Sequence, residues 1–288
     1  MKIKASAPGK LMLFGEHAVV YNYPCIVTTV SPRIYVEAEK KSGEIIIDIP
    51  QVKSDLFVRE SIKMFQNKYK VSGGLLIKTF SDFSSRYGFG SSSAVTVATL
   101  FALSKLYQIE LSKQEIFDLG YKVVLNVQGV GSGFDIAAAT FGGTLYFVTG
   151  GKVIEPLSIN SLPLVIGYSG MKADTTTLVK NLKQDFKIFD QIKKIVETAK
   201  ITLINGDWKK AGELMNQNHK LLQELGVSTE KLDKMCQAAV LSGAYGAKLS
   251  GAGGGDCMIT LVSPDKIKKV ESAIIKAGGE IINVKNNI

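Results

Sequence analysis

The chain has 288 residues, of which 45% are hydrophobic and 21% charged, and its formal net charge at pH 7 is +9. This is an ordinary globular composition, and the length suffices for one large or two ordinary domains. The lysines occur as singles and pairs without a long basic block, so the charge favours anionic metabolites over nucleic acid as partners.

The three cysteines, Cys25, Cys236 and Cys257, are far apart and lack C-x-x-C spacing. This pattern predicts reduced, mostly buried thiols rather than a metal site. No apolar run reaches membrane-spanning length, and the N-terminus lacks the apolar core of a signal peptide. We therefore expect a soluble, cytoplasmic protein without a membrane partner.

The N-terminal segment predicts two strands, over residues 3–7 and 11–14, joined by a turn at Pro8 and Gly9. Lys10, just past this turn, could carry a positive charge into a cleft, or it could be a surface lysine. Glu16 and His17 follow the second strand and could bind polar groups of a substrate. The alternative for His17 is an ordinary hydrogen-bonded histidine.

Two further strands are predicted over residues 26–30 and 34–38, separated by a turn at residues 31–33. Apolar positions then predict a strand over 44–49, a helix over 55–69 and a strand over 75–80.

Glycines and hydroxyls precede an apolar segment that continues to Leu106, in the order Gly88, Phe89, Gly90, Ser91, Ser92 and Ser93. Residues 90–93 are thus expected to form the first turn of a buried helix, whose free N–H groups and positive dipole end would bind phosphate. Ser92 could also ligate a phosphate-bound Mg²⁺. The alternative is a flexible turn with a serine N-cap. The segment has neither a Walker A ending nor a dinucleotide-binding fingerprint.

Ser112 and Glu115 form a capping box that predicts a helix reaching towards Val127. The second glycine-dense turn, over residues 129–135, ends in a single carboxylate, Asp135. Asp135 could act as a general base or as an electrostatic partner of Lys10. The alternative is an aspartate that caps a helix over residues 136–140.

Hydrophobic periodicity in the second half predicts strands over 144–148, 164–168 and 258–262 and helices over 175–185, 189–205, 208–225 and 229–242. We expect Asn216, Asn218 and His219 to be exposed or interhelical polar groups. A third glycine cluster, over residues 248–258, could supply main-chain amides to a phosphate chain or position a substrate. Its alternative is a β-bulge or tight hairpin.

These three clusters, in this order and spacing, resemble the galactokinase, homoserine kinase, mevalonate kinase and phosphomevalonate kinase (GHMP) superfamily over nearly the whole chain. Residues 7–21, 88–94 and 248–257 are similar to its first, second and third motifs. Residues 13–21 and 214–227 are similar to the mevalonate kinase version. The resemblance implies an α+β fold with two domains and an active site between them. Residues 1–160 would form an N-terminal domain like ribosomal protein S5 domain 2, and residues 161–288 a ferredoxin-like C-terminal domain.

The resemblance also implies an enzyme that uses ATP and Mg²⁺ to phosphorylate the 5-hydroxyl of mevalonate. Residues 88–93 would bind ATP, with Ser92 as the metal ligand, and Asp135 would be the catalytic aspartate beside Lys10. The substrate-binding residues would be Glu16, His17, Gly251, Gly253 and Gly254. The expected partner is this small-molecule substrate, and a homodimer is left open.

The sequence departs from the mevalonate kinase pattern at Val124, where that branch usually carries a Mg²⁺-binding glutamate. Residues 131–137 and 253–257 look more like phosphomevalonate kinases. Two alternatives therefore remain open: phosphorylation of 5-phosphomevalonate, and a non-catalytic ligand-binding member of the fold.

Overall fold

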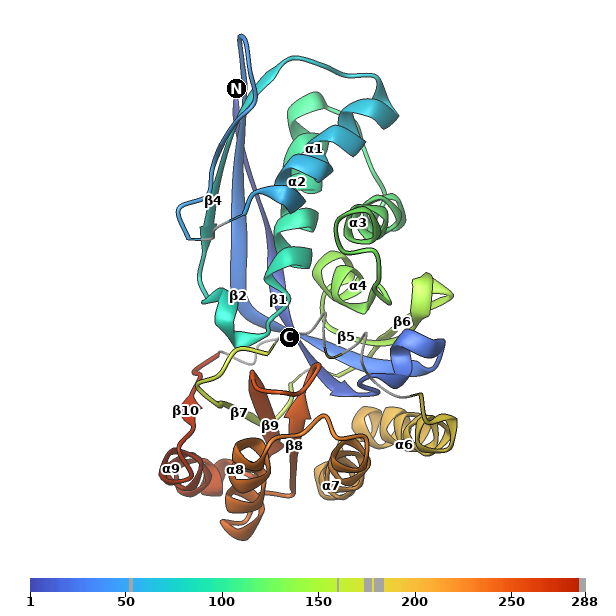
Figure 1. Ribbon diagram of the computed structural model, residues 1–288, viewed down its shortest axis with the longest axis vertical. Coiled ribbons are helices and arrows are strands. Elements are labelled where there is room, and N and C mark those ends of the chain that lie inside the picture. The colour runs from blue at the N-terminus through green and yellow to red at the C-terminus, as the bar shows by residue number, and fades with distance from the viewer. Residues whose placement is uncertain (52–53, 160, 174–177, 179–183, 285–288) are drawn as a thin grey trace.

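The computed structural model describes residues 1–51, 54–159, 161–173, 178 and 184–284, which form an α+β arrangement with two separate sheets (Figure 1). The strands are β1 (Lys2–Phe14), β2 (Pro24–Lys41), β3 (Ile46–Asp48), β4 (Gly74–Ser81), β5 (Thr144–Val148), β6 (Val153–Leu157), β7 (Leu164–Tyr168), β8 (Gly246–Ser250), β9 (Cys257–Leu261) and β10 (Glu280–Ile281). The α-helices are α1 (Leu56–Tyr69), α2 (Ser91–Tyr107), α3 (Lys113–Gln128), α4 (Phe134–Phe141), α6 (Phe186–Ile204), α7 (Trp208–Glu224), α8 (Glu230–Leu241) and α9 (Ile267–Lys276).

The first sheet is built on a long antiparallel pair, β1 and β2, and the two turns predicted within these strands are wrong. Each strand runs through, and the pairing shifts register where Pro8 opposes Arg33 but Gly9 opposes Val30. The chain forms a bulge here rather than two turns, because a bulge tolerates proline and bends a strand without ending it. The second half of β1 is thereby directed towards the other sheet.

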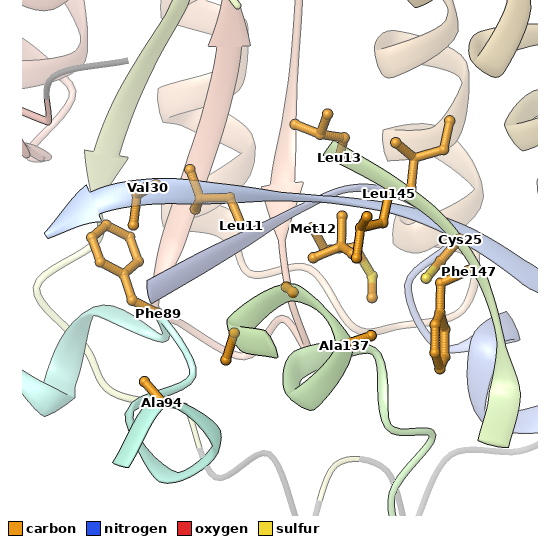
Figure 2. Packing of buried hydrophobic residues seen from close by; sticks show 14 of the residues in the cluster. Leu11, Met12, Leu13, Cys25, Val30, Phe89, Ala94, Ala137, Leu145 and Phe147 are labelled. Carbon is orange, nitrogen blue, oxygen red and sulfur yellow. The ribbon is translucent and has the colours of Figure 1, made fainter. Parts of the chain in front are cut away.

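Helices α1 to α4 cover one face of the first sheet (Figure 1). The predicted helix after the glycine-serine stretch is confirmed as α2, and its apolar residues are buried almost all round. A helix that is apolar on every side is expected in the interior. The capping box of Ser112 and Glu115 is confirmed at the start of α3. Figure 2 shows Ala94 of α2 and Ala137 of α4 in the same apolar cluster as side chains of β1, β2 and β5.

The second sheet has the order β10-β7-β9-β8, with every neighbouring pair antiparallel. One crossover with helices joins β7 to β8, β9 pairs with β8, and α9 connects β9 to β10. This β-α-β-β-α-β path is the ferredoxin-like arrangement expected for the C-terminal half. The predicted helix over 175–185 falls largely on residues outside the described ones.

Helix α6 joins the two halves, because it packs against β2 of the first sheet and against α7, a helix in the connection from β7 to β8. Tyr146 donates a hydrogen bond to Glu197 over 2.8 Å, and Lys200 pairs with Glu155 at 2.6 Å. A domain boundary between residues 160 and 161 stays a prediction. All three cysteines are free and buried, as predicted. Across the described ranges, no helix is both long enough and apolar enough to span a membrane.

Candidate active site

A cavity of about 260 Å³ lies where the three glycine clusters converge. Its wall is formed by the second half of β1 and the residues after it, the first turns of α2 and α4, and the loop after β8. Most residues singled out from the sequence line it: Lys10, Glu16, His17, Gly88, Gly90, Ser91, Ser92, Ser93, Asp135 and Gly251. Segments far apart in the chain thus meet at one place.

The first turn of α2 presents an anion-binding end to this cavity. The N-cap residue is Gly90, with φ +71°, and no side chain caps the helix, so the serine N-cap predicted as the alternative is wrong. The N–H groups of the first turn have no acceptor within the helix, and they carry the positive end of its dipole. Ser92 lies in this turn and lines the cavity.

Phe89 lies in the same loop but does not face the cavity with its side chain. The ring is buried, 1% exposed, and packs with the rings of Phe83 and Tyr87. Its carbonyl accepts a hydrogen bond of 3.0 Å from the N–H of Lys10. Binding of ATP by Phe89 therefore stays a prediction, and it would have to involve the main chain because the ring is buried.

Asp135 is the second residue of α4, whose N-cap is Gly133, and it makes no capping hydrogen bond. The Nζ of Lys10 lies 3.8 Å from Oδ1 of Asp135 and donates to the carbonyl of Gly88 over 3.1 Å. Burial raises the pKa of Asp135, and the positive charge of Lys10 opposes this effect. The arrangement leaves a carboxylate with raised basicity at the cavity wall, as a general base requires.

His17 and Glu16 follow β1 and face the loop after β8. The Nε2 of His17 lies 2.8 Å from the carbonyl oxygen of Ala252, so Nε2 carries the proton. Burial lowers the pKa of His17, which keeps the ring neutral with a bare Nδ1. Glu16 forms an ion pair with Lys248, and both side chains are inaccessible. Among the described residues, neither Oε2 of Glu16 nor Nδ1 of His17 has a hydrogen-bond partner.

Gly253 and Gly254 do not line the cavity, unlike Gly251. A Cβ on Gly253 would lie 2.0 Å from the carbonyl oxygen of Val227, and the N–H of Gly254 donates to that oxygen over 2.8 Å. Gly253 thus leaves space for the loop between α7 and α8, and Gly254 binds this loop through its N–H, while a Cβ on Gly254 would meet Leu178. Contact of either one with a substrate stays a prediction.

Two charged residues of the cavity were not singled out from the sequence. Asp256 has φ +54°, and its Oδ1 accepts a hydrogen bond of 2.9 Å from the N–H of Ala173. Lys172, the residue before Ala173, is exposed and lines the cavity. The signal for Asp256 was its place as the one carboxylate in a glycine cluster. No sequence signal distinguished Lys172 from other lysines.

Val124 of α3 also lines the cavity, so the usual position of a metal-binding glutamate is apolar here. Within the described ranges there is no group of three or more His, Cys, Asp or Glu residues that could hold a metal ion. Mg²⁺ in nucleotide sites often needs only one or two protein ligands, because phosphates and water supply the others. Ser92 fits such a role.

Family models match both halves of the chain: GHMP kinases N terminal domain over residues 56–143 and GHMP kinases C terminal over residues 192–280. The mevalonate kinase of Pyrococcus abyssi is 39% identical to this chain, with 96% of this chain and 93% of that protein covered. The chain belongs to the GHMP kinase family. As a GHMP kinase it is an ATP-dependent phosphotransferase.

Solved structures share the fold of this GHMP kinase. The L. major mevalonate kinase in complex with R-mevalonate is 28% identical with a TM-score of 0.83, covering 98% of this chain and 95% of that one. The Streptococcus pneumoniae phosphomevalonate kinase in complex with phosphomevalonate and AMPPNP has a TM-score of 0.90 and covers 98% and 99%. Its identity is only 19%, so it shows the fold alone.

Proposed function

We propose that this GHMP kinase transfers the γ-phosphoryl group of ATP to the 5-hydroxyl of mevalonate, in the mevalonate pathway of isoprenoid biosynthesis. Relatives named mevalonate kinase, 34% to 39% identical over nearly the full chain, support this choice. The observation that carries it is a pair of acceptor atoms in cavity-lining residues, Oε2 of Glu16 and Nδ1 of His17, that have no hydrogen-bond partner in the described part of the chain. Buried acceptors without a partner are costly, and hydroxyl groups of a substrate would satisfy them.

In the proposed reaction, the first turn of α2 binds the phosphates of ATP, and Asp135 orients or accepts the proton of the 5-hydroxyl. The hydroxyl oxygen bonds to the γ-phosphorus while the bond from that phosphorus to the bridging oxygen breaks, and ADP leaves. Lys10 keeps Asp135 ionised and lies beside the phosphate turn. Catalysis of this kind rests mainly on alignment and on charge neutralisation.

Mg²⁺ is proposed as the cofactor, held by Ser92 together with phosphate oxygens and water. When bound, Mg²⁺ neutralises charge on the phosphates. Val124 cannot contribute a ligand, so the protein offers fewer metal contacts than the pattern of mevalonate kinases implies. A cytoplasmic location and a homodimer stay predictions.

The second candidate is phosphorylation of 5-phosphomevalonate, and one observation favours it: Lys172 lines the cavity and could pair with a second phosphate. A coupled assay that measures ADP release with mevalonate and with 5-phosphomevalonate in parallel tests both. We expect mevalonate to give the higher kcat/KM. A preference for 5-phosphomevalonate by orders of magnitude would reverse the choice. ATP binding without turnover on either compound would indicate the non-catalytic alternative.

Gly90→Ala is expected to weaken ATP binding about tenfold or more, because a displaced phosphate turn would lose at least one hydrogen bond to a charged phosphate. The added Cβ would lie 3.0 Å from Cε of Lys10, at a positive φ that only glycine adopts freely. The matched control is Gly43→Ala, with φ +89° and no atom within 4 Å of the added Cβ. Both variants bear the backbone strain of roughly 1–2 kcal/mol. ATP affinity by calorimetry should fall only in Gly90→Ala, and equal affinities would contradict the assignment of this turn.

A further inference from the structure

Residues 248–252, at the end of β8 and in the loop after it, bind residues 12–17, at the end of β1 and just after it. The two segments lie far apart in the sequence and come from different sheets. Three contacts join them: Lys248 to Glu16, Ser250 to Met12, and Ala252 to His17. Lys248 and Ser250 point to the same side of β8, as residues two apart in a strand do, and the carbonyl of Ala252 follows in the loop after the strand. Glu16 and His17 are therefore fixed from the opposite sheet.

The ion pair of Glu16 and Lys248 is the charged one of these three contacts. Neither side chain is accessible to solvent. Lys248 donates hydrogen bonds to Oε1 of Glu16 and to the carbonyl of Leu249, the latter over 2.6 Å. The second carboxylate oxygen of Glu16 remains without a partner among the described residues. A buried carboxylate is tolerated only if a countercharge and hydrogen bonds compensate the lost water.

Among the residues that the structure describes, the other titratable groups that act on this pair do not supply that countercharge. Cys25 lies near Glu16, and burial raises the pKa of its thiol, which keeps it neutral. On the side of Lys248, burial raises the pKa of Cys236 and lowers that of His219 to about 4, despite the neighbouring Asp233. Burial raises the pKa of Glu16, the charge and hydrogen bond of Lys248 lower it most, and the N–H groups of Glu16 and Gly251 lower it further.

We propose that Lys248 is a positioning residue for the acceptor substrate: it holds Glu16 ionised and in place, so that the free carboxylate oxygen accepts a hydrogen bond from an acceptor hydroxyl. This inference rests on the proposed function, because it assumes that Glu16 contacts the acceptor. Lys248 itself does not line the cavity, so it acts through Glu16.

Lys248→Met should raise the KM for mevalonate about 10- to 100-fold, the range for losing a hydrogen bond to a charged group. The KM for ATP should change little. The KM for mevalonate should also rise further as pH falls, because Glu16 without its cation takes up a proton nearer neutral pH. The matched control is Lys200→Met, which breaks the pair with Glu155 across the same boundary but away from the cavity, and which should leave the KM for mevalonate unchanged.

The double variant Glu16→Gln/Lys248→Met keeps the test decisive if Lys248→Met does not fold. Removing both charges avoids the unpaired buried carboxylate, so its melting temperature should be close to that of the wild type. Its KM for mevalonate should equal that of Glu16→Gln, without pH dependence, because Lys248 acts through Glu16 alone. A folded Lys248→Met variant with the wild-type KM for mevalonate at every pH would overturn the inference. So would a double variant whose KM for mevalonate is well above that of Glu16→Gln. Failure of the proposed function is recognised separately, as a wild-type enzyme that does not turn over mevalonate.

Discussion

Asp135→Asn is expected to lower kcat by about 10²- to 10⁴-fold, the usual contribution of a positioned general base. Asparagine keeps the size of the side chain but cannot accept the hydroxyl proton. The KM for ATP should change little, because the phosphates are assigned to the first turn of α2. Steady-state kinetics on the purified variant measures both quantities, and a folded Asp135→Asn protein with wild-type kcat would remove the centre of the mechanism.

The stability of the same variant separates catalysis from helix capping. Burial raises the pKa of Asp135 in the folded protein, so the folded state binds the proton more tightly than the unfolded state does. The ionised carboxylate therefore costs stability above the folded pKa, and Asp135→Asn should leave the melting temperature at pH 7 unchanged or higher. Asp207 is the control, because its side chain does cap α7 by accepting from the N–H of Lys210 over 3.0 Å. Asp207→Ala should cost about 0.5–2 kcal/mol of stability with normal kcat.

The raised pKa of Asp135 also sets the pH dependence of turnover. Activity requires the ionised carboxylate, so kcat should fall as pH drops through a pKa above the ordinary value of 3.8. The acid limb should disappear in Asp135→Asn, whose residual activity has no such group to titrate. A wild-type profile that stays flat to below pH 4 would contradict this role.

Lys10→Met is expected to lower kcat by about 10²- to 10³-fold, the effect of removing one preorganised electrostatic contact from a site that excludes water. The side chain of Lys10 is 9% exposed, and its Nζ bridges Asp135 and the carbonyl of Gly88. Its removal therefore affects both the base and the phosphate turn. Lys4→Met is the matched control on the same strand, because Lys4 is exposed and packs over Tyr35, and it should keep normal kinetics.

Combining Lys10→Met with Asp135→Asn tests whether the two residues act as one unit. Residues that serve a single proton and charge are strongly non-additive, so the double variant should be less impaired than the product of the two single effects. Multiplicative losses in kcat would indicate that Lys10 acts on the phosphates independently of Asp135.

Local patterns in the sequence determined much of the site. The glycines and serines before an apolar run predicted the first turn of α2, and the capping box predicted the start of α3, because both depend on residues within a few positions of each other. The order of the three glycine clusters was sufficient to identify the family and to select site residues, most of which line the cavity.

Contacts between distant segments were decided only by the tertiary structure. The sequence predicted a turn at Pro8 and Gly9, but β1 continues through these residues with a bulge in its pairing with β2. Phe89 lies against β1, where its carbonyl accepts a hydrogen bond from the N–H of Lys10. Glu16 and Lys248 are 232 positions apart, and nothing local in either segment indicates that one neutralises the other. A buried charge is tolerated only where a partner compensates it, and here the position of that partner depends on how the two sheets pack.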